Sequence, residues 1–156
     1  MLNIVLIHPE IPNNTGNIGR LCIGTNCHLH LVHPLGFEIT DKQLKRSGLD
    51  YWPHLKLTEY KDFESWKAQL IDKSRVFLFT SNTQQSFLDV EYQDNDWLVF
   101  GRESKGLESE ILEQFKNHVL IPSTGKVRSF NIANAVSFGI GEALRQINSF
   151  EFLVKK

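Results

Sequence analysis

Short apolar runs alternate with stretches of helical periodicity along almost the whole chain. The runs at residues 77–79 and 98–100 are continuously apolar, as expected of central parallel strands that helices cover on both faces. The alternation predicts an α/β fold with a mostly parallel sheet and helices on both of its faces. We expect strands at residues 3–7, 28–32, 55–58, 75–80, 97–101 and 118–121, and helices at 15–25, shortly after 41, 63–71, 109–115 and 131–148.

Length and composition bound what such a fold can contain. With 156 residues, the chain is expected to form a single domain, residues 1–156. Its 41% hydrophobic and 22% charged residues are ordinary for a globular protein, and no apolar run approaches the roughly 20 residues of a membrane span. The first residues also lack a secretory pattern. We therefore expect a cytoplasmic protein that does not associate with a membrane.

Cysteine and histidine cluster near the second predicted strand, and thiolate and imidazole are the ligands that zinc prefers. The candidates are Cys27, His28, His30 and His33. Because side chains alternate between the two faces of a strand, these four cannot converge on one ion without a sharp bend. The spacing of Cys22 and Cys27 fits neither a disulfide framework nor a redox pair. We expect no metal site and two free thiols.

The formal net charge of −1 gives the chain as a whole no electrostatic preference for nucleic acid. The charges are unevenly distributed, however. Lys126 and Arg128 are the only charged residues between 123 and 135, and Arg20 carries the only formal charge between 11 and 37. These acid-free stretches form a positive patch if the fold brings them together, and otherwise belong to an ordinary mixed surface.

In an open parallel sheet, ligands bind beyond the carboxyl ends of the strands, so the loops that follow strands are the candidate sites. The first of these loops continues into residues 13–20, where amides, a hydroxyl and two glycines precede Arg20. Such residues supply hydrogen-bond donors and allow close approach of the backbone. The same stretch also fits a simple helix start capped by Asn14 or Thr15.

Two further loops have unusual compositions. Residues 101–107 place two glycines and three charges directly after a buried strand, but lack the Lys and Ser or Thr that a nucleotide-triphosphate loop requires. We expect Gly101 and Gly106 to serve a tight turn that a ligand can approach. Residues 122–130 lead into a helix with Ser129 and Asn131 at or near its cap. The free backbone N–H groups of such a helix start suit a carboxylate, a hydroxyl or a phosphate.

Two common enzyme classes fit these loops poorly. The first loop has Gly16 and Gly19 but not the third glycine of the dinucleotide-binding fingerprint, and no acidic residue follows the second predicted strand. The chain also contains no Gly-x-Ser-x-Gly elbow of the kind that serine hydrolases use. The sequence therefore disfavours both a dehydrogenase and a serine hydrolase.

Three motifs stand in order along the chain: NTGNIGR at residues 14–20, LVFGRESKGL at 98–107, and IP at 121–122 followed by RSFNIANAVS at 128–137. In order and spacing they closely resemble the SPOUT RNA methyltransferases of the SpoU branch, and the resemblance covers nearly the whole chain. The short length, the opening HPEIPNN at 8–14 and the expected lack of an appended RNA-binding domain are most similar to members that act on the wobble nucleotide of tRNA.

The resemblance implies a deep trefoil knot in the C-terminal third, S-adenosyl-L-methionine as cofactor in the knotted loops, and an obligate homodimer. General rules of topology argue against a knot, so this expectation rests on the family alone. Spacing assigns the strip of small residues Ala133, Ser137 and Gly141 either to the core or to a dimer seam, and the resemblance favours the seam. The implied cofactor-binding residues, mostly through main-chain groups, are Leu78, Thr80, Gly101, Glu103, Ile121, Pro122 and Ser129.

The implied reaction transfers a methyl group to the ribose 2′-hydroxyl of tRNA position 34, a cytidine or uridine. The family places Arg20 at the cofactor of the other subunit. Because arginine is not deprotonated in proteins, we expect it to bind phosphate and stabilise alkoxide charge instead of acting as a base. Asn14 and Asn134 are expected to orient Arg20 and the ribose, and Lys126 and Arg128 to bind RNA phosphates. The motifs leave open another tRNA position, ribosomal RNA as substrate, or a non-catalytic cofactor-binding RNA module.

Overall fold

Six strands form one sheet with the order β3-β2-β1-β5-β4-β6 in the computed structural model, which describes residues 1–39, 42 and 51–147. All neighbouring strands run parallel, which confirms the predicted sheet. β1 pairs with both β2 and β5, so the two halves of the chain meet at the centre of the sheet. The strands are β1 (Asn3–Ile7), β2 (His28–Val32), β3 (Leu57–Tyr60), β4 (Val76–Phe79), β5 (Trp97–Phe100) and β6 (Asn117–Val119).

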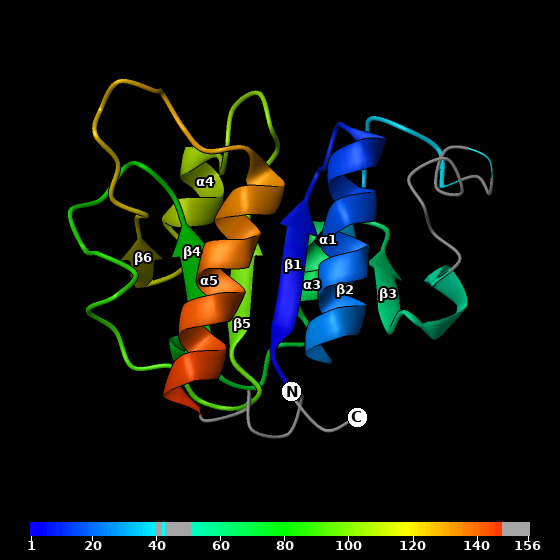
Figure 1. Cartoon of the computed structure of the whole chain (residues 1–156), viewed down its shortest axis with the longest axis horizontal. Helices are drawn as coiled ribbons and strands as arrows, with labels where there is room; N and C mark the ends of the chain where they lie inside the picture. Colours follow the sequence, from blue (N-terminus) through cyan, green and yellow to red (C-terminus); the bar gives the residue numbers. More distant parts are fainter. Residues whose placement is uncertain (40–41, 43–50, 148–156) are drawn as a thin grey trace.

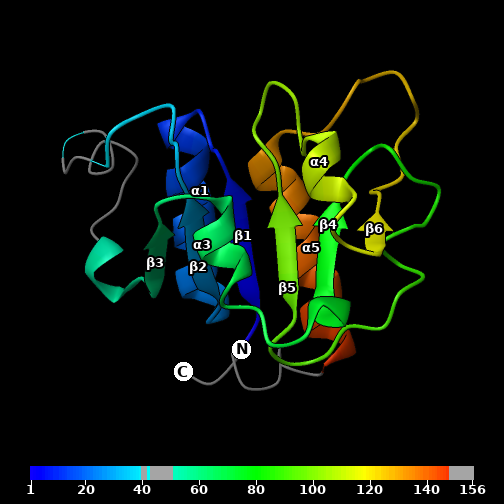
Figure 2. The same ribbon diagram turned by 180° about the vertical axis from the view of Figure 1, so that it is seen from behind.

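Helices cover both faces of this sheet, as the sequence predicts. Figure 1 shows α1 (Pro12–Thr25) and α5 (Ile132–Gln146) side by side on one face. Figure 2 shows α3 (Phe63–Lys67) and α4 (Ser109–Leu112) on the opposite face. Two single 3-10 turns, η1 (Trp52–His54) and η2 (Lys73–Arg75), precede β3 and β4.

The sheet separates two apolar layers because successive side chains of each strand point to opposite faces. Leu6 of β1 and Phe100 of β5 belong to the layer beneath α1 and α5. Val5 and Val99, their neighbours in the sequence, belong to the layer that contains Trp66 of α3. Each strand of the sheet centre is thus buried on both faces, which explains its continuous apolar sequence.

β1 and β2 have the predicted bounds, whereas several other elements are shifted or shorter. β3 lies two residues later than expected, because η1 and the residues that follow it occupy the start of that run. α1 begins at Pro12 instead of residue 15, since proline is well suited to the first turn of a helix. α3 ends at Lys67 instead of residue 71, where tight bonds such as Leu70 N–H to the Lys67 carbonyl close the last turn. The helix expected shortly after 41 and the last helix's expected end at 148 lie outside the described residues.

Candidate functional site: a cavity at the carboxyl edge of the sheet

Three loops follow the carboxyl ends of strands and meet around one cavity of about 770 Å³. We call them loop 1 (residues 8–11, after β1), loop 2 (101–108, after β5) and loop 3 (120–131, after β6). Figure 1 shows them at the edge toward which the strand arrows point. The volume lies within the range of about 300–1,000 Å³ that is typical of small-molecule sites.

The floor of the cavity is apolar and aromatic. The rings of Phe79 and Phe100 both line it and stack with their centroids 4.5 Å apart. α5 lies directly on this pair, because a Cβ atom at Gly139 would come within 2.9 Å of the Phe79 ring. Ile132 and Ala135 of α5 complete this part of the wall. Such a surface suits a flat heteroaromatic group.

Loop 2 folds tightly against itself at the cavity wall. A Cβ atom at Gly101 would lie 2.1 Å from the carbonyl carbon of Gly106, so no side chain fits there. Gly106 has a φ angle of +66°, in the left-handed region that glycine adopts most readily. The interpretation of this glycine pair as a tight turn is therefore confirmed.

Glu103 of loop 2 binds loop 1. Its carboxylate accepts hydrogen bonds from the backbone N–H groups of Glu10 (2.8 Å) and Ile11 (3.1 Å) and from Nδ2 of Asn14 (3.2 Å). The negative charge also lies at the start of α1, where the helix dipole favours an anion. The expected cap at Asn14 or Thr15 is wrong: both lie inside the helix, Ile11 is the N-cap, and no side chain of loop 1 caps it.

Asn131 connects loop 3 to α1. Its Oδ1 accepts from the N–H groups of Ala133 (2.9 Å) and Asn134 (3.4 Å), which confirms it as the cap of α5. Its Nδ2 donates to Oδ1 of the buried Asn14 at 3.0 Å. The amide of Asn14 thus receives one bond from loop 3 and gives one to Glu103 of loop 2.

A second connection joins the outer parts of the same loops. The N–H and Oγ groups of Ser104 donate to the Glu10 carboxylate at 3.0 and 2.7 Å, and these bonds lower the pKa of Glu10. Nη2 of Arg128 in loop 3 donates to the Ser104 carbonyl at 2.7 Å. The two connections form a hydrogen-bonded circuit around the cavity, which we call the rim network; its members are Glu10, Asn14, Glu103, Ser104, Arg128 and Asn131.

The structure brings most of the predicted site residues to this cavity. Leu78 is an exception, because its side chain packs in the opposite apolar layer with Trp66. Lys126 is exposed on loop 3 and does not line the cavity. Glu10 and Ser104 were not among the predicted residues, since the bonds between them span 94 residues of sequence. The predicted residues that line the cavity are Asn14, Thr80, Gly101, Glu103, Ile121, Pro122, Arg128 and Ser129.

Arg20 and Asn134 do not line the cavity of the single chain. Arg20 is exposed on α1, and its guanidinium carbon lies 5.5 Å from the centroid of the Tyr51 ring. Asn134 is exposed on the first turn of α5. The single chain therefore does not bring Arg20 to its own cavity, and its place at the cofactor of another subunit stays a prediction.

The strip of small residues on α5 is divided: Ala133 packs against the apolar layer of the core, whereas Ser137 is exposed. A Cβ atom at Gly141 would meet nothing within 4 Å. Ser137 and Gly141 line a groove of about 570 Å³ together with Leu88 and Phe138, whose side chains are 54% and 48% exposed. Large apolar side chains exposed in one patch are typical of an interaction surface.

The histidines of β2 lie on one face of the sheet, as strand alternation predicts, and their rings stack with centroids 4.0 Å apart. His30 is within hydrogen-bond distance of Asn3 (3.1 Å) and Tyr60 (3.1 Å), and His28 of Thr58 (2.9 Å). Burial lowers the pKa of His30 to about 3. We call these five residues the histidine cluster.

In residues 1–39, 42 and 51–147, no group of three or more His, Cys, Asp or Glu side chains is placed to hold a metal ion. In the same part of the chain, no helix is long and apolar enough to cross a lipid bilayer.

Comparison with known proteins identifies the family. The model of the SpoU rRNA methylase family matches residues 1–140. The tRNA (cytidine(34)-2′-O)-methyltransferase of Burkholderia cenocepacia is 42% identical over 149 residues, which cover 94% of this chain and 96% of that protein. The protein of the same name from Escherichia coli K12 is also 42% identical, with 94% of each chain covered.

Solved structures show the same similarity. A structure described by the 2-OH methylation of C/U34 on tRNA superposes with a TM-score of 0.89 at 42% identity, covering 94% of this chain and 95% of that chain. The SpoU methyltransferase AviRb from Streptomyces viridochromogenes, in complex with AdoMet, has a TM-score of 0.81 at 21% identity and covers 94% of this chain and 57% of that chain, which shows the shared fold. The family match over most of the chain, together with three motif loops around one cavity, shows that this chain belongs to the SpoU methylase family.

Proposed function

We propose that the protein transfers a methyl group from S-adenosyl-L-methionine to the ribose 2′-hydroxyl of nucleotide 34, a cytidine or uridine, in the anticodon loop of tRNA. The observation that carries the proposal is the meeting of all three motif loops around one cavity. The substrate follows from the relatives at 42% identity, whose names specify position 34 of tRNA.

The cavity fits the proposed cofactor. An adenine ring needs a flat apolar surface, which Phe100, Ile121 and Ile132 supply. A ribose and an amino-acid carboxylate need hydrogen-bond donors, and the Thr80 and Ser129 hydroxyls lie on the same wall. The Glu103 carboxylate is engaged by loop 1 and Asn14, which leaves its main chain as the group proposed to bind the cofactor.

When bound, S-adenosylmethionine supplies a methyl group on a sulfonium sulfur, which is displaced as a neutral thioether. The chain must then align the attacking oxygen, carbon and sulfur, and accept the charge that develops on the oxygen. The rim network serves alignment, because it holds three loops in one arrangement. Arg20 stabilises the developing alkoxide and the adjacent phosphate, while the hydroxyl proton leaves to a neighbouring group or water.

This role of Arg20 requires a homodimer. Arg20 does not line the cavity of its own chain, whereas Ser137, Gly141 and the exposed Phe138 of α5 offer a surface for a second copy. We propose that α5 packs across this seam, so that Arg20 and Asn134 of one subunit approach the cavity of the other. The C-terminal trefoil knot and the single-domain organisation belong to the same proposal.

The decisive experiment incubates the purified protein with total bacterial tRNA and cofactor that carries a labelled methyl group. Nuclease digestion then maps the modified nucleotide. We expect 2′-O-methylcytidine or 2′-O-methyluridine at position 34. Label in ribosomal RNA or at another tRNA position would show that this RNA or position, and not nucleotide 34 of tRNA, is the substrate. Cofactor binding by calorimetry without any RNA methylation would instead identify a non-catalytic module.

A further inference from the structure

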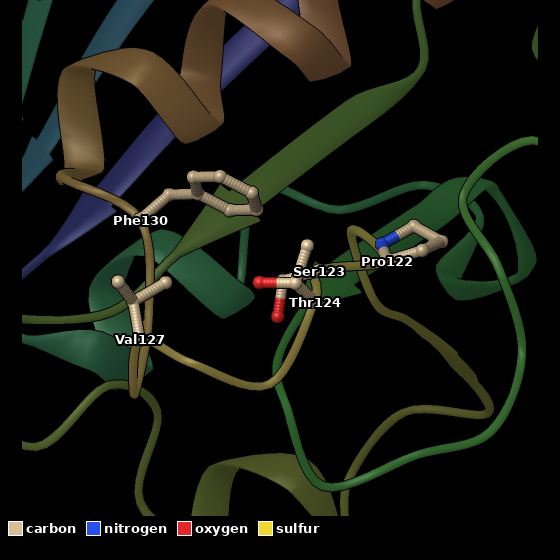
Figure 3. Close-up of a pocket in the computed structure, with 5 residues that line it drawn as sticks. All are labelled: Pro122, Ser123, Thr124, Val127 and Phe130. Carbon is tan, nitrogen blue, oxygen red and sulfur yellow. The ribbon is translucent and has the colours of Figure 1, made fainter.

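A second hollow adjoins the cavity. It has a volume of about 370 Å³ and lies entirely within loop 3. Figure 3 shows Phe130 and Val127 on one side of it, with the Phe130 ring pointing across toward Ser123, Thr124 and Pro122. We call this hollow the loop-3 pocket. Its volume is near the lower end of the range for small-ligand pockets, about 300–1,000 Å³.

The loop-3 pocket and the cavity share part of their walls, because Pro122, Ser123 and Phe130 line both. A group in the pocket therefore lies next to whatever occupies the cavity. In the proposed reaction, adjacent ribose carbons carry the 2′-hydroxyl and the base. When the hydroxyl reaches the methyl donor, the base must consequently lie beside the cavity.

Phe130 and Val127 give the pocket an apolar side. Val127 is 53% exposed, although it is large and apolar. The Phe130 ring is half-buried and packs against Phe138 of α5, with centroids 5.6 Å apart at an interplanar angle of 49°. α5 thus braces a ring whose remaining surface faces the pocket. Aromatic rings of this kind bind unpaired bases by stacking.

Ser123 and Thr124 give the pocket a polar side with unused donors. Oγ of Ser123 accepts from the Gly125 N–H at 3.3 Å, and Oγ1 of Thr124 accepts from the Lys126 N–H at 3.4 Å. Within the described part of the chain, neither hydroxyl donates a hydrogen bond, so each O–H group is available to a ligand. Cytosine and uracil both carry a carbonyl oxygen at C2 that accepts such a bond.

We infer that the loop-3 pocket receives the unstacked pyrimidine base of the acceptor nucleotide, which stacks on Phe130 and accepts hydrogen bonds from Ser123 and Thr124. The inference rests on the proposed function and deepens it. It explains how one site accepts both cytidine and uridine, because their shared O2 atom is the group that is bound. Phe130 is then a specificity-determining residue, and the exposed Lys126 beside it meets the flanking phosphate.

The test uses two tRNA substrates that differ only at position 34: one carries cytidine, and the other an abasic ribose that keeps its 2′-hydroxyl. Phe130→Leu keeps the apolar volume but removes the aromatic ring. Because Phe130 also lines the cavity, the measured quantity is the difference between the substrates: we expect kcat/KM to fall about tenfold more on the cytidine substrate than on the abasic one. Thr124→Val should give a smaller loss with the same dependence on the base.

Phe63→Leu is the matched control, because Phe63 packs with Trp66 and Phe115 on the opposite face of the sheet. It should lower stability without a base-dependent effect on kcat/KM. Equal losses on both substrates in Phe130→Leu would overturn the inference. So would a weaker cofactor Kd in calorimetry of Val127→Ala, because Val127 lines the loop-3 pocket and not the cavity. A wild-type protein that methylates neither substrate refutes the proposed function itself, and the inference with it.

Discussion

The rim network and the histidine cluster are both sets of hydrogen-bonded polar side chains, but the first connects separate loops and the second connects adjacent strands. In the histidine cluster, His30 bonds to Asn3 and Tyr60 from adjacent strands, so these polar groups satisfy one another's hydrogen bonds. In the rim network, Asn14 and Asn131 bridge segments 117 residues apart and border a cavity. Polar side chains therefore indicate a site where they hold a space open between loops, and indicate packing where they fill the space themselves.

The largest effect is expected at Arg20, which the proposed mechanism places at the reacting oxygen. Arg20→Ala should lower kcat for methyl transfer by about 10³-fold, because it removes the cation that meets the developing alkoxide. Cofactor affinity should stay unchanged, because the proposed partners of Arg20 in the other subunit are the alkoxide and the RNA phosphate and not the cofactor. Stability should stay unchanged because Arg20 is exposed. Single-turnover assays with labelled cofactor measure the effect. Lys73→Ala, an exposed cation on η2, is the control and should be silent.

The rim network itself can be broken at Glu103. Glu103→Gln keeps the shape but turns an amide donor toward groups that already donate, namely the N–H groups of loop 1 and Nδ2 of Asn14. We expect cofactor Kd to weaken about 10- to 100-fold, with a loss of about 1–3 kcal/mol in the free energy of unfolding. Glu64→Gln removes a surface ion pair to Lys67 and serves as control. A loss of stability with an unchanged cofactor Kd would show that the rim network stabilises the fold without shaping the cofactor site.

The histidine cluster should respond to acid instead of to substrate. Because burial lowers the pKa of His30 from 6.5 to about 3, the folded state resists a proton that the unfolded chain binds below pH 6.5. This contribution to stability is complete above pH 6.5 and is lost as the pH falls toward 3, at up to about 1.4 kcal/mol per pH unit. Urea unfolding between pH 4 and 7 measures it.

His30→Leu should flatten that pH dependence while kcat/KM at neutral pH stays within about twofold of wild type, because the cluster does not border the cavity. The exposed His54 provides the control, and His54→Leu should keep the wild-type slope. Activity that falls in His30→Leu in a fully folded protein would mean that the two polar sets are coupled.

The smallest effect is expected from Lys126, which is exposed outside the cavity on loop 3. Lys126→Ala should weaken tRNA binding by about two- to fivefold for every sequence and lower the slope of log K against log salt by about one. Filter binding at several salt concentrations measures both. An unchanged slope would show that RNA phosphates do not contact this side chain.

Local pattern was sufficient to predict much of the fold. The apolar runs of β1 and β2 located those strands to the residue, and the glycines of loop 2 indicated its tight turn. Helix ends were predicted less well. α3 ends early because bonds between residues three apart, such as Leu70 N–H to the Lys67 carbonyl, close its last turn. Before α1, the backbone N–H of Glu10 binds Glu103, which is far away in the sequence.

The site was only partly predictable for a related reason. Strand ends and composition identified the loops, but Glu10 and Ser104 acquire their roles through contacts across 94 residues that no local pattern encodes. Asn131 was recognised as a helix cap, while its bond to Asn14 depends on α1 and α5 lying side by side. The strip of small residues on α5 shows most clearly what spacing cannot predict, because the same four-residue spacing holds Ala133, which packs against the core, and Ser137, which is exposed.

The pairing of β1 with β5 has a consequence for biosynthesis. The strands that carry loops 1 and 2 come from opposite halves of the chain, and the last wall of the cavity is α5, which begins at Ile132. Contacts of such long sequence separation form late and slowly. A nascent chain on the ribosome therefore cannot enclose the methyl donor until its final helix has emerged, and truncated translation products should be inert toward RNA.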